Sequence, residues 1–240
     1  MVPLQVSGAE GANWLGLLGF AALLALFGVI FLVVAILPDR REKAAFRKLA
    51  SRRGWRVAHR PGQGGRGSII TIRPGAGEGW HAEIRRYQSA SLQIRTVEFR
   101  SKTPALTQGL VAIGPSLSAA QAGMTGSMIA SMPIGLRDLL FGGSEYDSLA
   151  PQAAGLRLAP SIQVEGGSVF TAGAPDAFTI AEVYAPLLRQ WRVTAPDSDT
   201  FPVLILSSQG LRLRVRRDLD ADRVEALIDL GAALADGVTP

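Results

Sequence analysis

The chain contains no cysteine, only two histidines and few aromatic side chains among its 240 residues. The lack of cysteine excludes disulfide scaffolds, thiolate metal sites and cysteine nucleophiles. The sequence also lacks the Walker phosphate-binding loop, the Gly-x-Ser-x-Gly nucleophile elbow and the His-Glu-x-x-His zinc motif. We therefore expect no catalytic residue, no metal site and no bound cofactor, and we predict that the protein is not an enzyme.

Two weaker patterns in the sequence could indicate a cofactor or metal site. Residues 62–67 match the glycine spacing of a dinucleotide-binding loop, but a β-branched run follows them, where a phosphate-binding loop needs a helix N-terminus. His59, His81 and Glu83 form a conceivable metal site only if their strands are adjacent. We interpret the first as a hairpin loop and the histidines as surface residues.

An apolar stretch of 23 residues, Leu15 to Leu37, contains no charged side chain. A helix of that length rises about 34 Å, which covers a hydrocarbon core of about 30 Å. The segment before it lacks the basic start of a cleaved signal peptide, and Trp14 suits a membrane-interface anchor. The pattern predicts a short leader at 1–14 and a single transmembrane helix at 15–37.

The next segment, residues 38–60, carries nine basic side chains against two acidic ones, whereas the leader has no lysine or arginine. The positive-inside rule then places the N-terminus of a single-pass membrane protein outside and its C-terminal body in the cytoplasm. In residues 61–240 acidic side chains slightly outnumber basic ones, so no nucleic-acid partner is expected. The side chains expected to contact anionic lipid headgroups are Arg40, Arg41, Lys43, Arg47, Lys48, Arg52 and Arg53.

The hydropathy pattern predicts an α+β fold, in which antiparallel strands and packed helices form a body over 61–240. A basic helix over 40–53 should bury Phe46 and Leu49 and end at Gly54. Strands are expected at 55–58, 68–73, 80–87, 92–100, 201–207 and 211–217, and further helices near 177–191 and 221–235. The recurrence of Trp-Arg-Val at 55–57 and 191–193 leaves open two related subdomains, divided near 103–150.

The predicted strand at 211–217 alternates apolar and basic side chains. Leu211, Leu213 and Val215 should face a core. Arg212, Arg214 and Arg216 should then face water, because successive side chains of a strand point to opposite faces.

Residues 103–136 contain no charge, and Met124, Met128 and Met132 occur there at intervals of four residues. In a helix these side chains share one face, beside Leu117. Flexible methionine side chains fill gaps in a core, and they also form adaptable docking surfaces. Both interpretations stay open, and the docking interpretation assigns Met124, Met128, Met132 and Leu117 to a partner contact.

The order of the segments resembles that of uncharacterised single-span membrane proteins of bacteria, and the resemblance implies a location in the bacterial inner membrane. The features that carry the resemblance are the apolar span, the basic helix, the Gly54-Trp55 junction and the terminal hairpin and helix around Gly210 and after Asp218. We predict a non-catalytic accessory subunit or assembly factor of a larger integral-membrane complex, respiratory or photosynthetic. The alternative is a membrane-tethered sensor or binding domain for a small ligand or a lipid headgroup.

Overall fold

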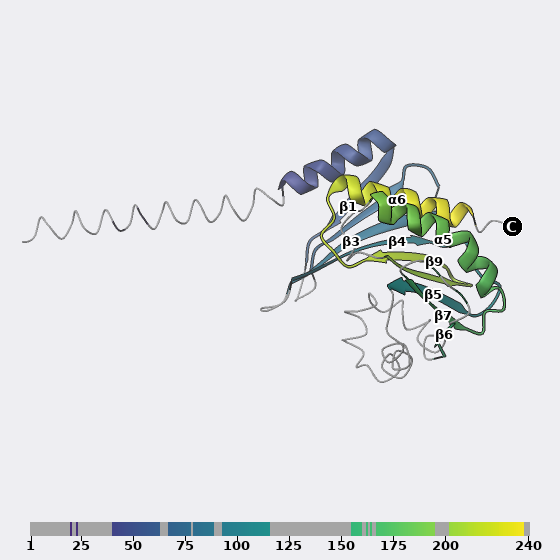
Figure 1. Ribbon diagram of the computed structural model, residues 1–240. Coiled ribbons are helices and arrows are strands. Elements are labelled where there is room, and N and C mark those ends of the chain that lie inside the picture. Colours follow the sequence, from purple (N-terminus) through teal and green to yellow (C-terminus); the bar gives the residue numbers. More distant parts are fainter. Residues whose placement is uncertain are drawn as a thin grey trace, which may run out of the picture. The chain divides into compact units, whose positions relative to one another are not determined.

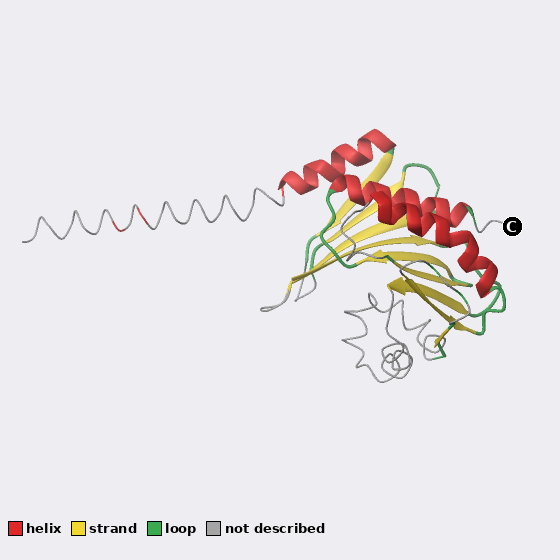
Figure 2. Cartoon of the chain, viewed as in Figure 1, coloured by secondary structure: helices red, strands yellow, loops and turns green. Residues whose placement is uncertain are grey.

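The computed structural model describes residues 20, 23, 40–62, 67–77, 79–88, 93–115, 155–159, 162, 164, 167–194 and 202–237. The chain divides into two compact units, residues 1–47 and residues 48–240. In these ranges the fold is α+β, with nine antiparallel strands and three helices (Figures 1 and 2). Residues 40–53 are helical and are called the basic helix below. The labelled elements are β1 (Trp55–Arg60), β2 (Ile69–Pro74), β3 (Trp80–Gln88), β4 (Gln93–Ser101), β5 (Leu110–Pro115), β6 (Arg157–Leu158), β7 (Gly167–Ala172), α5 (Ala177–Thr194), β8 (Val203–Ser207), β9 (Gly210–Val215) and α6 (Ala221–Asp236).

All nine strands belong to one sheet in the order β1-β2-β3-β4-β9-β8-β5-β7-β6. The first four strands form the antiparallel meander that the sequence predicts, and each lies within a few residues of its expected range. The β8–β9 hairpin then inserts between β4 and β5. Strands from before and after residues 116–154 are therefore joined in a single sheet.

Helix α6 packs on one face of the sheet, chiefly over β4, and α5 packs beside α6 (Figure 2). Helix α6 begins where the Asp220 carboxylate accepts a hydrogen bond of 2.8 Å from the Arg223 N–H. It buries Val224, Leu227, Ile228, Gly231 and Leu234 against the sheet. The glycine is required at this contact, because a Cβ atom on Gly231 would lie 2.4 Å from the Phe99 ring.

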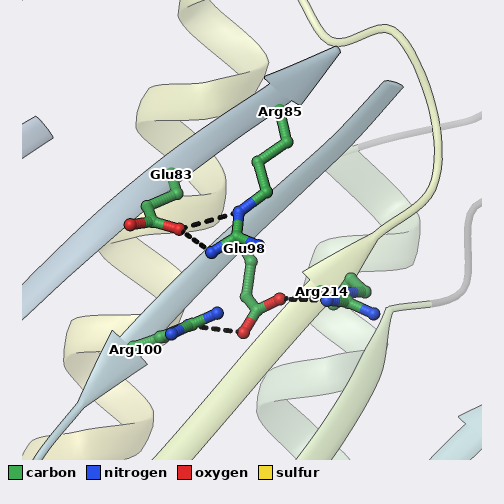
Figure 3. Close-up of polar contacts among 5 residues, drawn as sticks. All are labelled: Glu83, Arg85, Glu98, Arg100 and Arg214. Carbon is green, nitrogen blue, oxygen red and sulfur yellow. Dashed lines mark hydrogen bonds and ion pairs between the residues drawn. The ribbon is translucent and has the colours of Figure 1, made fainter. Parts of the chain in front are cut away.

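Alternation along the strands sorts the side chains onto two faces. Val97, Phe99 and Leu213 are fully buried on the face that α6 covers. The opposite face is apolar toward β6, where Leu110, Leu156, Phe170 and Ile205 form a second core cluster. The same face is charged over β3, β4 and β9 (Figure 3).

Helix α5 is longer than the sequence pattern predicts. It continues to Thr194, so Trp191 lies inside a helix and is buried, whereas Trp55 is the first residue of a strand. The two Trp-Arg-Val tripeptides therefore occupy different local structures, and the recurrence carries no evidence of duplication.

Candidate functional site

All seven predicted lipid-contact residues lie in the basic helix. Arg40, Arg41, Arg47 and Lys48 are exposed and Lys43 is half-buried, while Phe46, Leu49 and Ala50 are buried as the apolar spacing predicts. Gly54 ends the helix at a φ of +66°, a conformation that glycine adopts without strain.

Arg52 and Arg53 differ from the other basic side chains because they hold the end of the basic helix against α6. Arg52 pairs with Glu225, and Arg53 pairs with Glu225 and Asp229. The Arg53 guanidinium also lies over the Trp55 ring, 5.0 Å from its centroid. These two arginines thus have a structural role within the domain, in addition to any contact with lipid.

The other predicted contact residues, Trp14, Leu117, Met124, Met128 and Met132, lie outside the described residues. Among the residues that the structure describes, no helix combines the length and apolar character needed to cross a membrane. Of the stretch 15–37, the described residues are Phe20 and Leu23, which are helical and 64% and 53% exposed.

The charged face of the sheet holds a cluster that the sequence pattern does not predict. Glu98, Arg100 and Arg214, called the ion-pair cluster below, are 3%, 5% and 8% exposed (Figure 3). The Arg100 Nε atom donates to Oε1 of Glu98 at 2.6 Å, and the Arg214 Nε atom donates to Oε2 at 2.9 Å. The expectation that Arg214 faces water is wrong, because the register of β4 with β9 places it directly opposite Glu98.

The environment of Glu98 decides its protonation. Burial by itself raises the pKa of the carboxyl group, but the charges and hydrogen bonds of Arg214 and Arg100 outweigh burial and hold the pKa below its ordinary value of 4.5. The carboxylate is therefore ionised at neutral pH and balances one of the two arginines that contact it.

A second pair extends this charged face on β3, where Arg85 donates from Nε to Glu83 at 2.9 Å. A sequence signal for both pairs exists in retrospect: Glu83-Ile84-Arg85 and Glu98-Phe99-Arg100 repeat the same acid-x-base spacing, and residues i and i+2 of a strand share a face.

The strands β1 and β3 are separated by β2, so His59 and His81 are not on neighbouring strands. Within the described part of the chain, no group of histidine and carboxylate side chains could hold a metal ion.

A groove of about 840 Å³ opens between the loop that precedes β5 and the helix α5. The lining residues are Thr103, Pro104, Ala105, Leu106, Thr107, Asp176, Thr179, Ile180, Val183, Tyr184, Ser208 and Gly237. Ala105, Leu106 and Tyr184 are buried, whereas Val183 is 47% exposed. The described lining thus combines apolar side chains and hydroxyls, and Asp176 is the charged residue among these described side chains.

A hydrogen bond ties the groove to the sheet, and burial decides the charge of the tyrosine in its lining. The Ala105 N–H donates to the Ser207 carbonyl at 3.1 Å, which fixes the loop against the end of β8. Burial raises the pKa of Tyr184 to about 12, so its phenol stays neutral at physiological pH. The groove can therefore accept an apolar or neutral group beside the Tyr184 phenol.

Comparisons of the chain with protein-family models, with curated proteins and with solved structures found no match.

Proposed function

We propose that the protein is a membrane-anchored, non-catalytic accessory subunit whose α+β domain is held at the cytoplasmic surface of the inner membrane. The observation that carries the proposal is the row of exposed Arg40, Arg41, Arg47 and Lys48, which comes directly after the uncharged stretch 15–37. Basic side chains close to a span are attracted to anionic headgroups by about 1 kcal/mol each. The high exposure of Phe20 and Leu23 supports a hydrocarbon environment for that stretch.

The proposed partner is a larger integral-membrane complex, respiratory or photosynthetic. The span and the uncharged segment 103–136, with its row of methionines, are the proposed contacts.

Purification of the full-length protein in a mild detergent tests this proposal. We expect stoichiometric comigration with other membrane proteins, and loss of that comigration when Met124→Gln and Met128→Gln are combined. Phe178→Gln is the matched control, because Phe178 is an apolar side chain of α5 that is 53% exposed and lies outside the groove lining. A monodisperse protein that purifies alone would contradict the proposal.

The groove favours a second candidate, a tethered sensor or binding domain for a small ligand or lipid headgroup. Its volume of about 840 Å³ and its mixture of apolar and hydroxyl side chains are typical of small-molecule sites. For this candidate we expect a ligand-dependent rise in unfolding temperature that Thr179→Arg abolishes. Phe178→Arg makes the same change in charge one residue away, outside the lining, and should keep the response.

A further inference from the structure

Two arginines face each other at the β1 edge of the sheet, beyond which no further described strand pairs. The register of β1 with β2 places Arg56 directly opposite Arg73, so both side chains lie on the same face. Both are exposed, and β1 is the terminal strand of the sheet. Arg60 lies on that face too, two side-chain positions further along β1, and is also exposed.

Like charges directly opposite each other on a sheet are destabilising. Inside the sheet, Arg100 faces Arg212 in the same way, and there Glu98 supplies a carboxylate to Arg100. At the edge, no described acidic side chain pairs with Arg56 or Arg73. Arg56 and Arg73, called the edge pair below, therefore face each other as Arg100 and Arg212 do, but no described carboxylate pairs with them.

The carboxylate of Glu83, which lies opposite Thr71 on the same face of the sheet, is paired with Arg85. The next pair of side chains on the same face is Ala58 opposite Thr71, both small. Two guanidinium groups held about 5 Å apart at Cβ can each donate two parallel N–H bonds to one phosphate group. Arg56 also follows the basic helix closely, because only Gly54 and Trp55 separate it from Arg53.

We propose that Arg56 and Arg73 together bind the phosphate group of an anionic lipid headgroup, while Arg60, two side-chain positions further along β1, adds positive charge to the same face. The choice of lipid rests on the proposed function, because a domain anchored by residues 15–37 and followed by the basic helix is held beside a dense surface of such groups. This second contact would fix the angle of the domain on the membrane, which a single anchoring helix does not.

The experiment uses the full-length protein in a nonionic detergent, titrated with dihexanoylphosphatidylglycerol while the unfolding temperature is recorded. We expect the unfolding temperature to rise by about 5–10 °C when the lipid concentration is about 100 times the dissociation constant. Arg56→Gln with Arg73→Gln should raise the dissociation constant about tenfold or more, since charge-assisted bonds from two residues are lost. The same variant should unfold at a temperature no lower than the parent when lipid is absent, because repulsion is removed.

Three further variants distinguish binding at Arg56 and Arg73 from nonspecific electrostatic attraction between basic side chains and the anionic lipid. Lys102→Gln with Arg216→Gln removes the same charge from two exposed residues elsewhere and should leave the dissociation constant within about twofold. Arg56→Lys with Arg73→Lys should give an intermediate value, because a lysine keeps the charge without the bidentate geometry. Arg40→Gln with Arg47→Gln removes two basic side chains that the proposed function places near the headgroups and leaves the edge pair intact. The rise in unfolding temperature with lipid should therefore persist in this variant.

Equal lipid responses in the parent and the Arg56/Arg73 variant would overturn the inference, as would an equal loss in the Lys102/Arg216 control. Inorganic phosphate that stabilises the parent as well as the lipid does would assign the site to free phosphate and overturn the lipid assignment. If alkaline washing releases the full-length protein from membranes while its lipid response still depends on Arg56 and Arg73, the proposed anchoring fails and the site stands.

Discussion

Replacing Glu98 with glutamine removes the carboxylate at the centre of the ion-pair cluster and keeps the shape of the side chain. Arg100 and Arg214 would then remain buried, at 5% and 8% exposure, without the anion that contacts both. Breaking a buried ion pair by removing one partner costs about 3–5 kcal/mol, because an uncompensated charge is left in the interior. For a domain of this size that loss lowers the unfolding temperature by about 6–20 °C.

The same substitution should change the response to acid. The pKa of Glu98 is lowered in the folded chain, so the carboxylate contributes stability above its ordinary value of 4.5, and that contribution is lost as the pH falls through the folded pKa. The parent should therefore lose more stability than Glu98→Gln between neutral pH and a pH below 4.5. The difference in free energy of unfolding between the parent and Glu98→Gln should therefore become smaller as the pH falls.

Thermal unfolding of full-length parent and variant, followed by circular dichroism at several pH values, measures both effects. Glu182→Gln makes the same substitution on the exposed surface of α5 and should stay within about ±0.5 kcal/mol of the parent. In the double variant Glu98→Gln with Arg214→Gln, the second change should cost less than it does alone, because the two residues interact directly. Equal unfolding temperatures for parent and Glu98→Gln at neutral pH would refute the reasoning.

Two other predictions follow from single contacts of α6, and a third follows from the spacing of the methionines in the sequence. Gly231→Ala should destabilise the fold by about 1–3 kcal/mol, although alanine favours helices, because the new Cβ would meet the Phe99 ring; guanidinium titration checks the sign. Asp220→Ala should cost about 1 kcal/mol by removing the N-cap of α6, whereas Asp220→Asn should cost much less; the same titration compares them. Met124→Gln with Met128→Gln should leave the unfolding temperature nearly unchanged if these side chains dock a partner, and should lower it if they pack in a core.

The local periods of the sequence predict much of the fold. The meander of β1 to β4, the β8–β9 hairpin and α6 all follow from alternation, turn residues and an apolar helical face. Leu211, Leu213 and Val215 are buried as expected, because their spacing marks one face of a strand.

The ion-pair cluster could not be predicted in this way, because alternation assigns a side chain to a face without saying what covers that face. Glu98 and Arg214 are 116 residues apart, and only the insertion of β9 beside β4 brings them together. The sequence pattern also predicts too short a helix α5, since Trp191, Val193 and Thr194 have no strong helical preference and their state depends on packing.

The topology of the chain tests the central proposal most directly. A reporter fused after Pro240, active in only one compartment, should show a cytoplasmic C-terminus in membranes that retain the protein after alkaline washing. The basic residues 38–60 require this result, because positively charged flanks stay on the cytoplasmic side. A reporter active outside the cytoplasm, or a protein recovered entirely in the alkaline supernatant, would contradict the account.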